Sequence, residues 1–196
     1  MDLPWMRKEP DSIASKTQDY ATTLFASSQQ LHAMLSTYFS RIHPWFPFIS
    51  QQIFYERFQT LNSTSEHSFV LLLCSMHLIL FIPPQPEVGW ARSSTYSEVK
   101  RLLSLAEAQG PLVIDLVQCR ILVTLYEMNH GAIDEAYLSL GSCARTGVVL
   151  GLNYSERPKH ESDHRQWMQK EEERRTWWAI TILDRYELPL EAKHHD

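Results

Sequence analysis

The spacing of apolar residues predicts two helices in the first third of the chain. Apolar side chains recur every three or four positions over residues 20–41 and, over a shorter length, in residues 51–61. Pro44 and Pro47 separate these helices, because proline lacks the backbone donor and clashes with the preceding turn. The corner between the helices is too apolar for a solvated loop, and we expect it to fill part of the core. Its apolar and aromatic members are His43, Trp45, Phe46, Phe48 and Ile49.

Two further segments are apolar on nearly every side, which is typical of helices enclosed by other helices. They span residues 69–82 and residues 112–130. The first contains His77, stops at a proline pair and is shorter than the roughly 18 residues that a membrane span needs. Both are therefore expected to be buried core helices, and no membrane partner is expected.

Amphipathic helices are expected over residues 95–109 and 133–150, with Gly131 as the stop between this last helix and the one before it. Small residues lie three apart on one side of the second helix, at Gly141, Ala144 and Gly147. Glycine within a helix costs about 1 kcal/mol relative to alanine, so we expect a neighbouring helix to approach closely there. The polar or proline-bearing segments 83–92 and 153–166 are expected to be loops.

The run from Glu171 to Arg185 is the most distinctive in the chain. Three glutamates and two arginines precede Trp177 and Trp178, and a largely apolar stretch follows. We expect the charges to form the first turn of a helix, where acidic residues favour the helix dipole and pair with arginines three or four positions on. The rest of this helix is expected to be enclosed, with both indoles packed in a multi-helix core.

Composition limits the class of fold. The chain has 196 residues, 44% of them hydrophobic, and only 6 glycines, with few runs of alternating β-branched residues. We therefore expect an all-α fold, a multi-helix domain of packed antiparallel helices. These helices are expected to form pairs joined by short turns. The division expected is an N-terminal extension at residues 1–19, one helical domain at 20–188 and a tail at 189–196.

Charge and cysteine content exclude other classes of function. The formal net charge is -5, so the surface as a whole repels a phosphate backbone and does not bind DNA by charge. Cys74, Cys119 and Cys143 lie far apart, without the C-x-x-C spacing of a zinc site, and are expected to be buried free thiols. The first ten residues lack the apolar core of a secretory signal, which favours a protein that stays inside the cell.

Glu-x-x-His triplets raise the alternative of a metalloenzyme, because di-iron helical bundles use this spacing. The triplets are Glu127 with His130, Glu161 with His164, and Glu191 with His194. The second triplet falls in an expected loop and the third falls in the tail. The first lies on the more polar side of its helix. No nucleophile motif, phosphate-binding loop or carboxylate pair stands out, so we expect no enzyme activity, no catalytic or metal site and no cofactor.

Four pieces of the sequence, in this order, resemble the middle homology region of fungal zinc-cluster transcription factors, a family of all-helical regulatory domains. The resemblance covers roughly residues 38–186. The pieces are Tyr38-Phe39 with His43-Pro44-Trp45-Phe46-Pro47-Phe48-Ile49 and Phe54; Leu116-Val117-Gln118-Cys119-Arg120 with Leu125-Tyr126 and His130-Gly131; Ala136-Tyr137 with Gly141, Ala144-Arg145 and Leu150-Gly151-Leu152; and Glu171 to Arg185.

The resemblance implies a nuclear protein that modulates transcription by RNA polymerase II. In this family DNA is bound through a separate zinc cluster of six cysteines, and this chain has no such cysteines. The resemblance therefore implies that only that separate module would bind zinc and contact DNA. Relative to the family, the chain looks truncated at both ends. The implied partners are other transcription factor subunits or co-regulators, with a homodimer or heterodimer as further possibilities. A stand-alone helical interaction scaffold is the alternative reading.

The family motif singles out eight residues with expected structural roles. They are Arg145, Gly151, Arg174, Arg175, Trp177, Trp178, Asp184 and Arg185. If Asp184 is buried it needs a partner, since an unpaired buried charge is very costly, and Arg145 is the partner that we expect. Arg174 and Arg175 stabilise the start of their helix or, on the alternative reading, form a docking surface for another protein.

Overall fold

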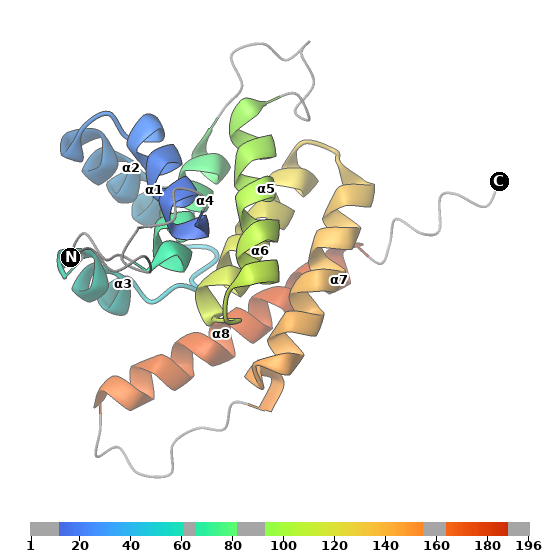
Figure 1. Cartoon of the computed structure of the whole chain (residues 1–196). Coiled ribbons are helices and arrows are strands. Elements are labelled where there is room, and N and C mark those ends of the chain that lie inside the picture. The colour runs from blue at the N-terminus through green and yellow to red at the C-terminus, as the bar shows by residue number, and fades with distance from the viewer. Residues whose placement is uncertain (1–11, 61–65, 82–92, 155–163, 188–196) are drawn as a thin grey trace, which may run out of the picture.

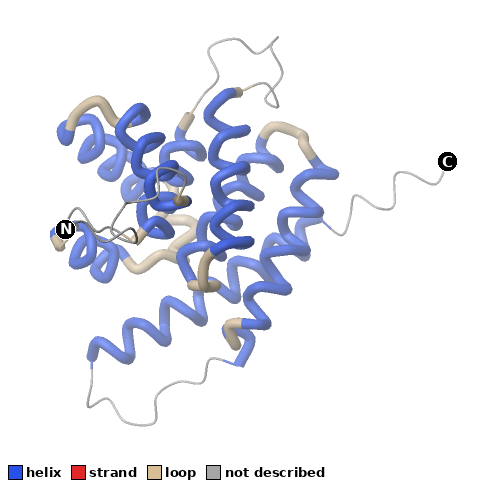
Figure 2. Tube along the Cα trace, viewed as in Figure 1, coloured by secondary structure: helices blue, strands red, loops and turns tan. Residues whose placement is uncertain are grey.

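A computed structural model describes residues 12–60, 66–81, 93–154 and 164–187, and every regular element in these ranges is a helix (Figures 1 and 2). The predicted all-α fold is confirmed. The expected loop 83–92 and the tail 189–196 lie outside the described residues, as does most of the expected loop 153–166. The expected domain boundaries stay predictions.

The chain folds into eight α-helices and one short 3-10 helix within the described ranges. They are α1 (Ile13–Leu24), α2 (Ser28–Arg41), α3 (Gln51–Gln59), α4 (His67–Leu80), α5 (Ser94–Gln109), α6 (Ile114–Asn129), α7 (Ile133–Val149), the 3-10 helix η4 (Leu152–Tyr154) and α8 (His164–Glu187).

The single helix expected over residues 20–41 is wrong, because the structure has two helices there. The chain leaves α1 at Phe25, and the side chain of Ser27 then caps α2 by accepting a hydrogen bond from the backbone N–H of Gln30 at 3.2 Å. A serine cap offers the backbone an alternative to continuous helix, which the apolar spacing alone does not reveal. α1 also begins at Ile13, within the segment expected to be an extension.

Helices α4 and α6 form the centre of the bundle, which confirms that both are buried core helices. α6 packs against α4, α5, α7 and α8, while α1 and α2 cover α4 from the other side (Figure 1). Every residue of α6 from Asp115 to Glu127 is buried. None of the described helices combines the length and the apolar character needed to cross a membrane.

The charged residues of α6 are buried because neighbouring helices supply their partners. Arg57 of α3 donates two hydrogen bonds to Asp115, at 2.8 and 2.7 Å, and the hydroxyl of Ser68 donates a third at 3.0 Å. Glu127 accepts hydrogen bonds from Tyr96 Oη at 2.7 Å and Lys100 Nζ at 2.6 Å. A buried charge is tolerated when it is paired and hydrogen-bonded, so these contacts also fix α3 and α5 against α6.

The corner at residues 43–49 fills part of the core, as its composition predicted. Phe46, Phe48 and Ile49 are buried, whereas Trp45 stacks on the ring of Phe46 and is 58% exposed. The three cysteines are buried and free, which is also confirmed. Burial raises the pKa of the Cys74 thiol to about 12.

Glycines end two helices and allow a close contact in a third. Gly131 and Gly151 both have φ of 72°, the left-handed conformation that ends α6, as predicted, and α7. A Cβ at Gly147 would lie 3.1 Å from Ile180 Cδ1 and 3.3 Å from Trp177 Cζ3 of α8. The close approach expected from the row of small residues is therefore present at Gly147. A Cβ at Gly141 would meet only the Arg145 guanidinium of its own helix, at 3.5 Å.

Replacing Gly147 with valine should lower the free energy of unfolding by about 1–3 kcal/mol, because the larger side chain overpacks the contact with α8. Gly141→Ala is the matched control in the same helix and should raise it by up to about 1 kcal/mol, since alanine is the better helix former and its methyl group has room. Urea denaturation of both variants checks this. A Gly147→Val protein as stable as the parent would show that α7 and α8 do not meet there.

Candidate functional site

Helix α8 carries the distinctive run, and its first turn is not the charged segment that we expected. α8 begins at His164 and extends for 24 residues, so residues 171–175 begin about two turns into the helix. Residues 164–166, which were expected to end the loop, instead form the start of this helix. The expected favourable interaction of this segment with the helix dipole is therefore wrong, since that effect is confined to the terminal turn.

The expectation that α8 is enclosed on all sides is also wrong. Only one face of α8 is buried, against α6, α7 and the corner before α3, and the opposite face is exposed. The buried residues are Met168, Glu172, Thr176, Ala179, Ile180 and Leu183. In Figure 1, α8 crosses one side of the bundle as an outer helix. This inner face, together with the corner that it contacts, forms the first part of the candidate site.

Glu172 joins α8 to the segment that precedes α3. Its Oε1 accepts a hydrogen bond from the backbone N–H of Ser50 at 2.9 Å, and a second from the side-chain amide of Gln118 at 3.2 Å. Ser50 is the N-cap of α3, so the carboxylate lies at the positive end of that helix. One carboxylate oxygen thus holds α8, α6 and the start of α3 together.

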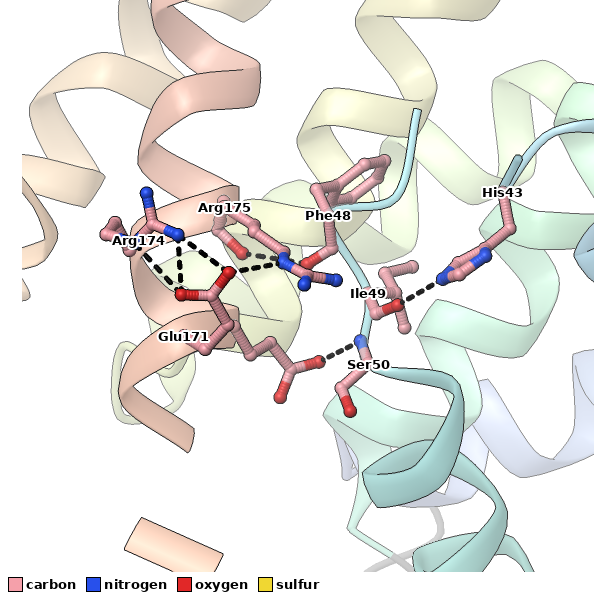
Figure 3. A network of polar contacts seen from close by, with 9 residues as sticks. His43, Phe48, Ile49, Ser50, Glu171, Arg174 and Arg175 are labelled. Atoms are coloured by element: carbon pink, nitrogen blue, oxygen red, sulfur yellow. Dashed lines mark hydrogen bonds and ion pairs between the residues drawn. The ribbon is translucent and has the colours of Figure 1, made fainter. Parts of the chain in front are cut away.

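Thr176, one turn after Glu172, extends this junction. Its hydroxyl donates to the backbone carbonyl of Phe48 at 3.4 Å and accepts from the Gln118 amide at 3.4 Å. On the other side of the corner, His43 Nε2 lies 3.0 Å from the carbonyl of Ile49 (Figure 3). Three consecutive residues of the corner are therefore hydrogen-bonded through their backbones, which fixes its path. We call Glu172, Thr176, Gln118 and Ser50 the α8 junction.

Burial shifts the pKa of two groups at the corner in opposite directions. It raises the pKa of the Glu172 carboxyl above its ordinary value, although hydrogen bonds from Ser50 and Gln118 partly oppose the shift. It lowers the pKa of His43, an effect that the nearby positive charge of Arg175 strengthens and the hydrogen bond with Ile49 opposes. The folded protein therefore favours a neutral imidazole at this position.

The paired charges expected in the run are confirmed. Glu171 accepts hydrogen bonds from Arg174 at 2.6, 2.7 and 3.0 Å and from Arg175 Nε at 2.8 Å (Figure 3). Burial alone would raise the pKa of Glu171, but these two guanidinium groups lower it. Arg174 is half-buried and Arg175 is exposed, and helical pairs of this kind near the surface contribute only a few tenths of a kcal/mol each.

The two tryptophans differ in their surroundings. Trp177 is half-buried and packs against Gly147, which fits its predicted place in the core. Trp178 is 53% exposed, so the prediction that both indoles are enclosed is wrong for this residue. Adjacent helix positions point about 100° apart, and with only one face of α8 covered the second indole must face solvent.

The structure does not bring the other predicted site residues together. Arg145, Asp184 and Arg185 are all exposed, and in the described part of the chain no ion pair joins Arg145 to Asp184. The expected pair is therefore wrong, because its premise, a buried Asp184, does not hold. Gly151 has a conformational role, since its φ of 72° ends α7.

Sequence reasoning missed the polar residues that position α8. Glu172 and Thr176 occur at the spacing of the apolar inner residues Met168, Ala179 and Leu183, and Gln118 lies in an otherwise apolar helix. A polar residue at a core position needs a hydrogen-bond partner, and this was the available signal. The metalloenzyme alternative drew attention to Glu127, but the carboxylate of Glu127 accepts hydrogen bonds from Tyr96 and Lys100. In the other two triplets, Glu161, Glu191 and His194 lie outside the described residues.

The chain is similar in sequence to fungal transcription factors. The model of a family described as the fungal specific transcription factor domain matches residues 35–187, from α2 to the end of α8. The chain is 30% identical to "Transcription factor BOA15" of Botryotinia fuckeliana over 70% of this chain and 76% of that protein. It is 26% identical to "Tropolone cluster transcription factor tropK" of Talaromyces stipitatus over 75% of this chain and 26% of that protein.

A further relative is the "Pigment biosynthesis transcriptional activator pigB" of Monascus ruber, 24% identical over 84% of this chain and 31% of that protein. The matched region thus makes up less than a third of both tropK and pigB. No solved structure matches the chain. The family match covers most of the chain, which therefore belongs to the fungal-specific transcription factor domain family, and the predicted resemblance is confirmed.

Truncating Glu172 to alanine should lower the free energy of unfolding by about 1–3 kcal/mol, because it leaves the Ser50 N–H and the Gln118 amide without their acceptor in a buried site. Glu172→Gln keeps an acceptor oxygen and should lose less. Chemical denaturation at neutral pH compares the two. Equal losses in both variants would show that the charge, and not the acceptor, matters at this position.

Glu172 should also give the protein a distinct pH dependence of stability. Its pKa is raised in the folded state, so the folded protein binds this proton more tightly than the unfolded chain. The stabilising contribution is complete below the ordinary value of 4.5 and is lost as pH rises through the folded-state pKa. The free energy of unfolding of the wild type minus that of Glu172→Gln should therefore increase as pH falls from neutral toward 4.5. A difference independent of pH would contradict a buried carboxylate.

Proposed function

We propose that this chain is a regulatory domain that acts in the nucleus and modulates transcription by RNA polymerase II through contacts with other proteins, without enzyme activity. The family match over residues 35–187 is the observation that carries this proposal. The relatives are named as transcription factors or as a transcriptional activator, and these names point to the regulation of transcription. The α8 junction supports a structural role for the inner face of α8, which leaves the outer face for partners.

Charge supports a division of labour between this domain and a DNA-binding module. The formal net charge of -5 disfavours binding to the phosphate backbone. The arginines of the outer face of α8 are partly neutralised, since Arg174 and Arg175 share the carboxylate of Glu171. Sequence-specific DNA contact is therefore assigned to a zinc-cluster module of the kind that the family uses, in another part of the regulator or in a partner.

The names of two relatives suggest the class of regulated genes. One is named for a tropolone cluster and another for pigment biosynthesis. We extend this to the present chain as a proposal: its targets are genes of a biosynthetic cluster. Deletion of the encoding gene, followed by transcript profiling, should change the expression of a contiguous group of biosynthetic genes.

The domain alone should form no specific complex with DNA at moderate salt in a gel shift. Fused to a heterologous DNA-binding domain, it should instead change the expression of a reporter that carries the matching operator. Its Glu172→Ala variant, with the α8 junction broken, should lose most of this effect. A specific gel shift by the domain alone would contradict the proposed division, and a silent fusion that is folded and nuclear would contradict the regulatory role.

Reversing the charges of Arg174 and Arg175 separates the two readings of these residues. Arg175 is exposed and Arg174 is half-buried, so Arg174→Glu with Arg175→Glu should weaken the reporter effect if this side of α8 is a docking surface. The melting temperature should fall only slightly, because exposed pairs contribute little. Circular dichroism and the reporter assay measure the two effects separately. An unchanged reporter with a lowered melting temperature would leave only the stabilising role.

A further inference from the structure

The outer face of α8 combines large exposed apolar side chains with arginines. Its apolar members are Trp167, Trp178, Ile182 and Tyr186, all of them exposed. Its charged members are Glu171, Arg174, Arg175 and Arg185. Trp178 follows the buried Thr176 by two residues, so it points about 160° away from it, and the others follow at helical steps along the same side. Exposed apolar residues gathered along one helix mark an interaction surface.

The charges on this face do not balance. Three guanidinium groups accompany one carboxylate, because the other described acidic side chains of α8 point elsewhere. Glu172 is buried in the α8 junction, Glu173 pairs with Lys170, and Asp184 lies six positions after Trp178 and so points about 120° away from it. The outer face of α8 is therefore locally positive in a chain whose formal net charge is -5.

Two of the guanidinium groups have donors to spare. Arg175 bonds to Glu171 through Nε alone, and its two terminal nitrogens make no other ion pair with the described residues. Arg185 has no ion-pair partner in the described part of the chain. An arginine presents five N–H donors that match a carboxylate in geometry, so both residues can receive carboxylates from outside.

We infer that the outer face of α8 binds an acidic amphipathic helix of another protein. This inference rests on the proposed function, since it names the chemistry of the partner that the regulatory domain contacts. The apolar side of the partner helix packs on Trp178 and Ile182, and its carboxylates accept hydrogen bonds from Arg175 and Arg185. Tryptophan and arginine are the residues that most often dominate the binding energy of such contacts.

The dimensions of the face define the partner further. From Trp167 to Tyr186 it extends for about 28 Å, the length of a helix of about five turns. Arg175 and Arg185 lie ten residues apart, so the carboxylates that they bind are separated by about 15 Å. The partner therefore carries an acidic residue toward each end of an apolar stripe of about three turns, a pattern that a single amphipathic helix supplies.

The chain itself offers no such segment outside the described ranges. In residues 1–11, 61–65, 82–92, 155–163 and 188–196, acidic residues exceed basic residues by one at most. None of these segments repeats apolar residues at helical spacing between two acidic ends. Charge complementarity therefore favours a segment of another protein.

A nucleic acid strand is the competing anionic partner, because bases stack on tryptophan and arginine. It fits this face less well. A strand places phosphates along its whole length, where they meet Glu171 as well as the net negative charge of the chain. An acidic helix needs only the two local guanidinium contacts, and its apolar side also covers the indole.

A designed peptide tests the surface. The probe is a labelled 20-residue helical peptide with leucines along one side and glutamates at both ends of that stripe, and lysines replace the glutamates in the control peptide. The purified chain should bind the lysine peptide at least about tenfold more weakly, because like charges then meet at Arg175 and Arg185. Fluorescence anisotropy measures both affinities. Equal affinities, or no binding of the acidic peptide, would overturn the inference.

Variants of the chain locate the binding on α8. Trp178→Ala and Arg185→Glu should each weaken binding of the acidic peptide at least about tenfold. Leu138→Ala and Arg145→Glu are the matched controls, since both residues are exposed and lie on the side of α7 opposite Gly147, which faces α8. The controls should leave the affinity nearly unchanged, and circular dichroism should show the helical content of the wild type in all four variants. Equal losses in the controls would place the binding elsewhere and overturn the inference.

Two further measurements separate this inference from its alternatives. A single-stranded oligonucleotide with the charge of the acidic peptide should bind more weakly than that peptide, and tighter binding of the oligonucleotide would overturn the choice of a protein partner. A reporter fusion that acts although the chain binds no acidic peptide would contradict this inference alone. A silent fusion of a chain that does bind the peptide would contradict the proposed function alone.

Discussion

The position of α8 depends on one buried carboxylate. Glu172 is removed from water, which is costly, and it is tolerated because Ser50 and Gln118 donate hydrogen bonds to it. These donors belong to the start of α3 and to the central helix α6. Glu172 can satisfy both only when α8 lies across the corner before α3. Thr176 adds the same requirement one turn later, through the carbonyl of Phe48.

This constraint sets the two faces of α8 and thereby the candidate site. With Glu172 and Thr176 turned inward, Trp178 and Ile182 are directed to solvent, because they lie on the other side of the helix. Gly147 has a complementary role, since the absence of a side chain there lets Trp177 and Ile180 approach α7 closely. The arginines that pair with Glu171 remain on the outer face. The exposure of Trp178 and Ile182 is therefore a consequence of how the inner face is held.

The central helix α6 shows the same physical rule on a larger scale. Its charged residues Asp115 and Glu127 are buried, and each is hydrogen-bonded by a cation from another helix. Arg57 of α3 and Lys100 of α5 thus bind two different helices to one central element. Buried charges of this kind give a helix bundle specific neighbours, because an unpaired charge in any alternative arrangement would be strongly destabilising.

The sequence by itself determined the fold class and the main core elements. Long apolar segments at α4 and α6 can be stable only when enclosed, and glycine at position 131 ends a helix because it adopts positive φ at little cost. The ordered motif pieces also indicated the family, and the pairs of Glu171 with its arginines followed from helical spacing alone. These features are local, or depend only on the periodicity of one helix, so they can be read without knowing the neighbours.

The tertiary structure alone decided which side of α8 faces the core and which charges are paired. Around Trp177 and Trp178 the sequence is apolar on several sides, and nothing local distinguishes the indole that packs on Gly147 from the one in solvent. Likewise, Asp115 finds Arg57 at a separation of 58 residues, whereas Asp184 stays exposed. Pairings between distant segments depend on the relative placement of whole helices, which the packing of the complete core determines.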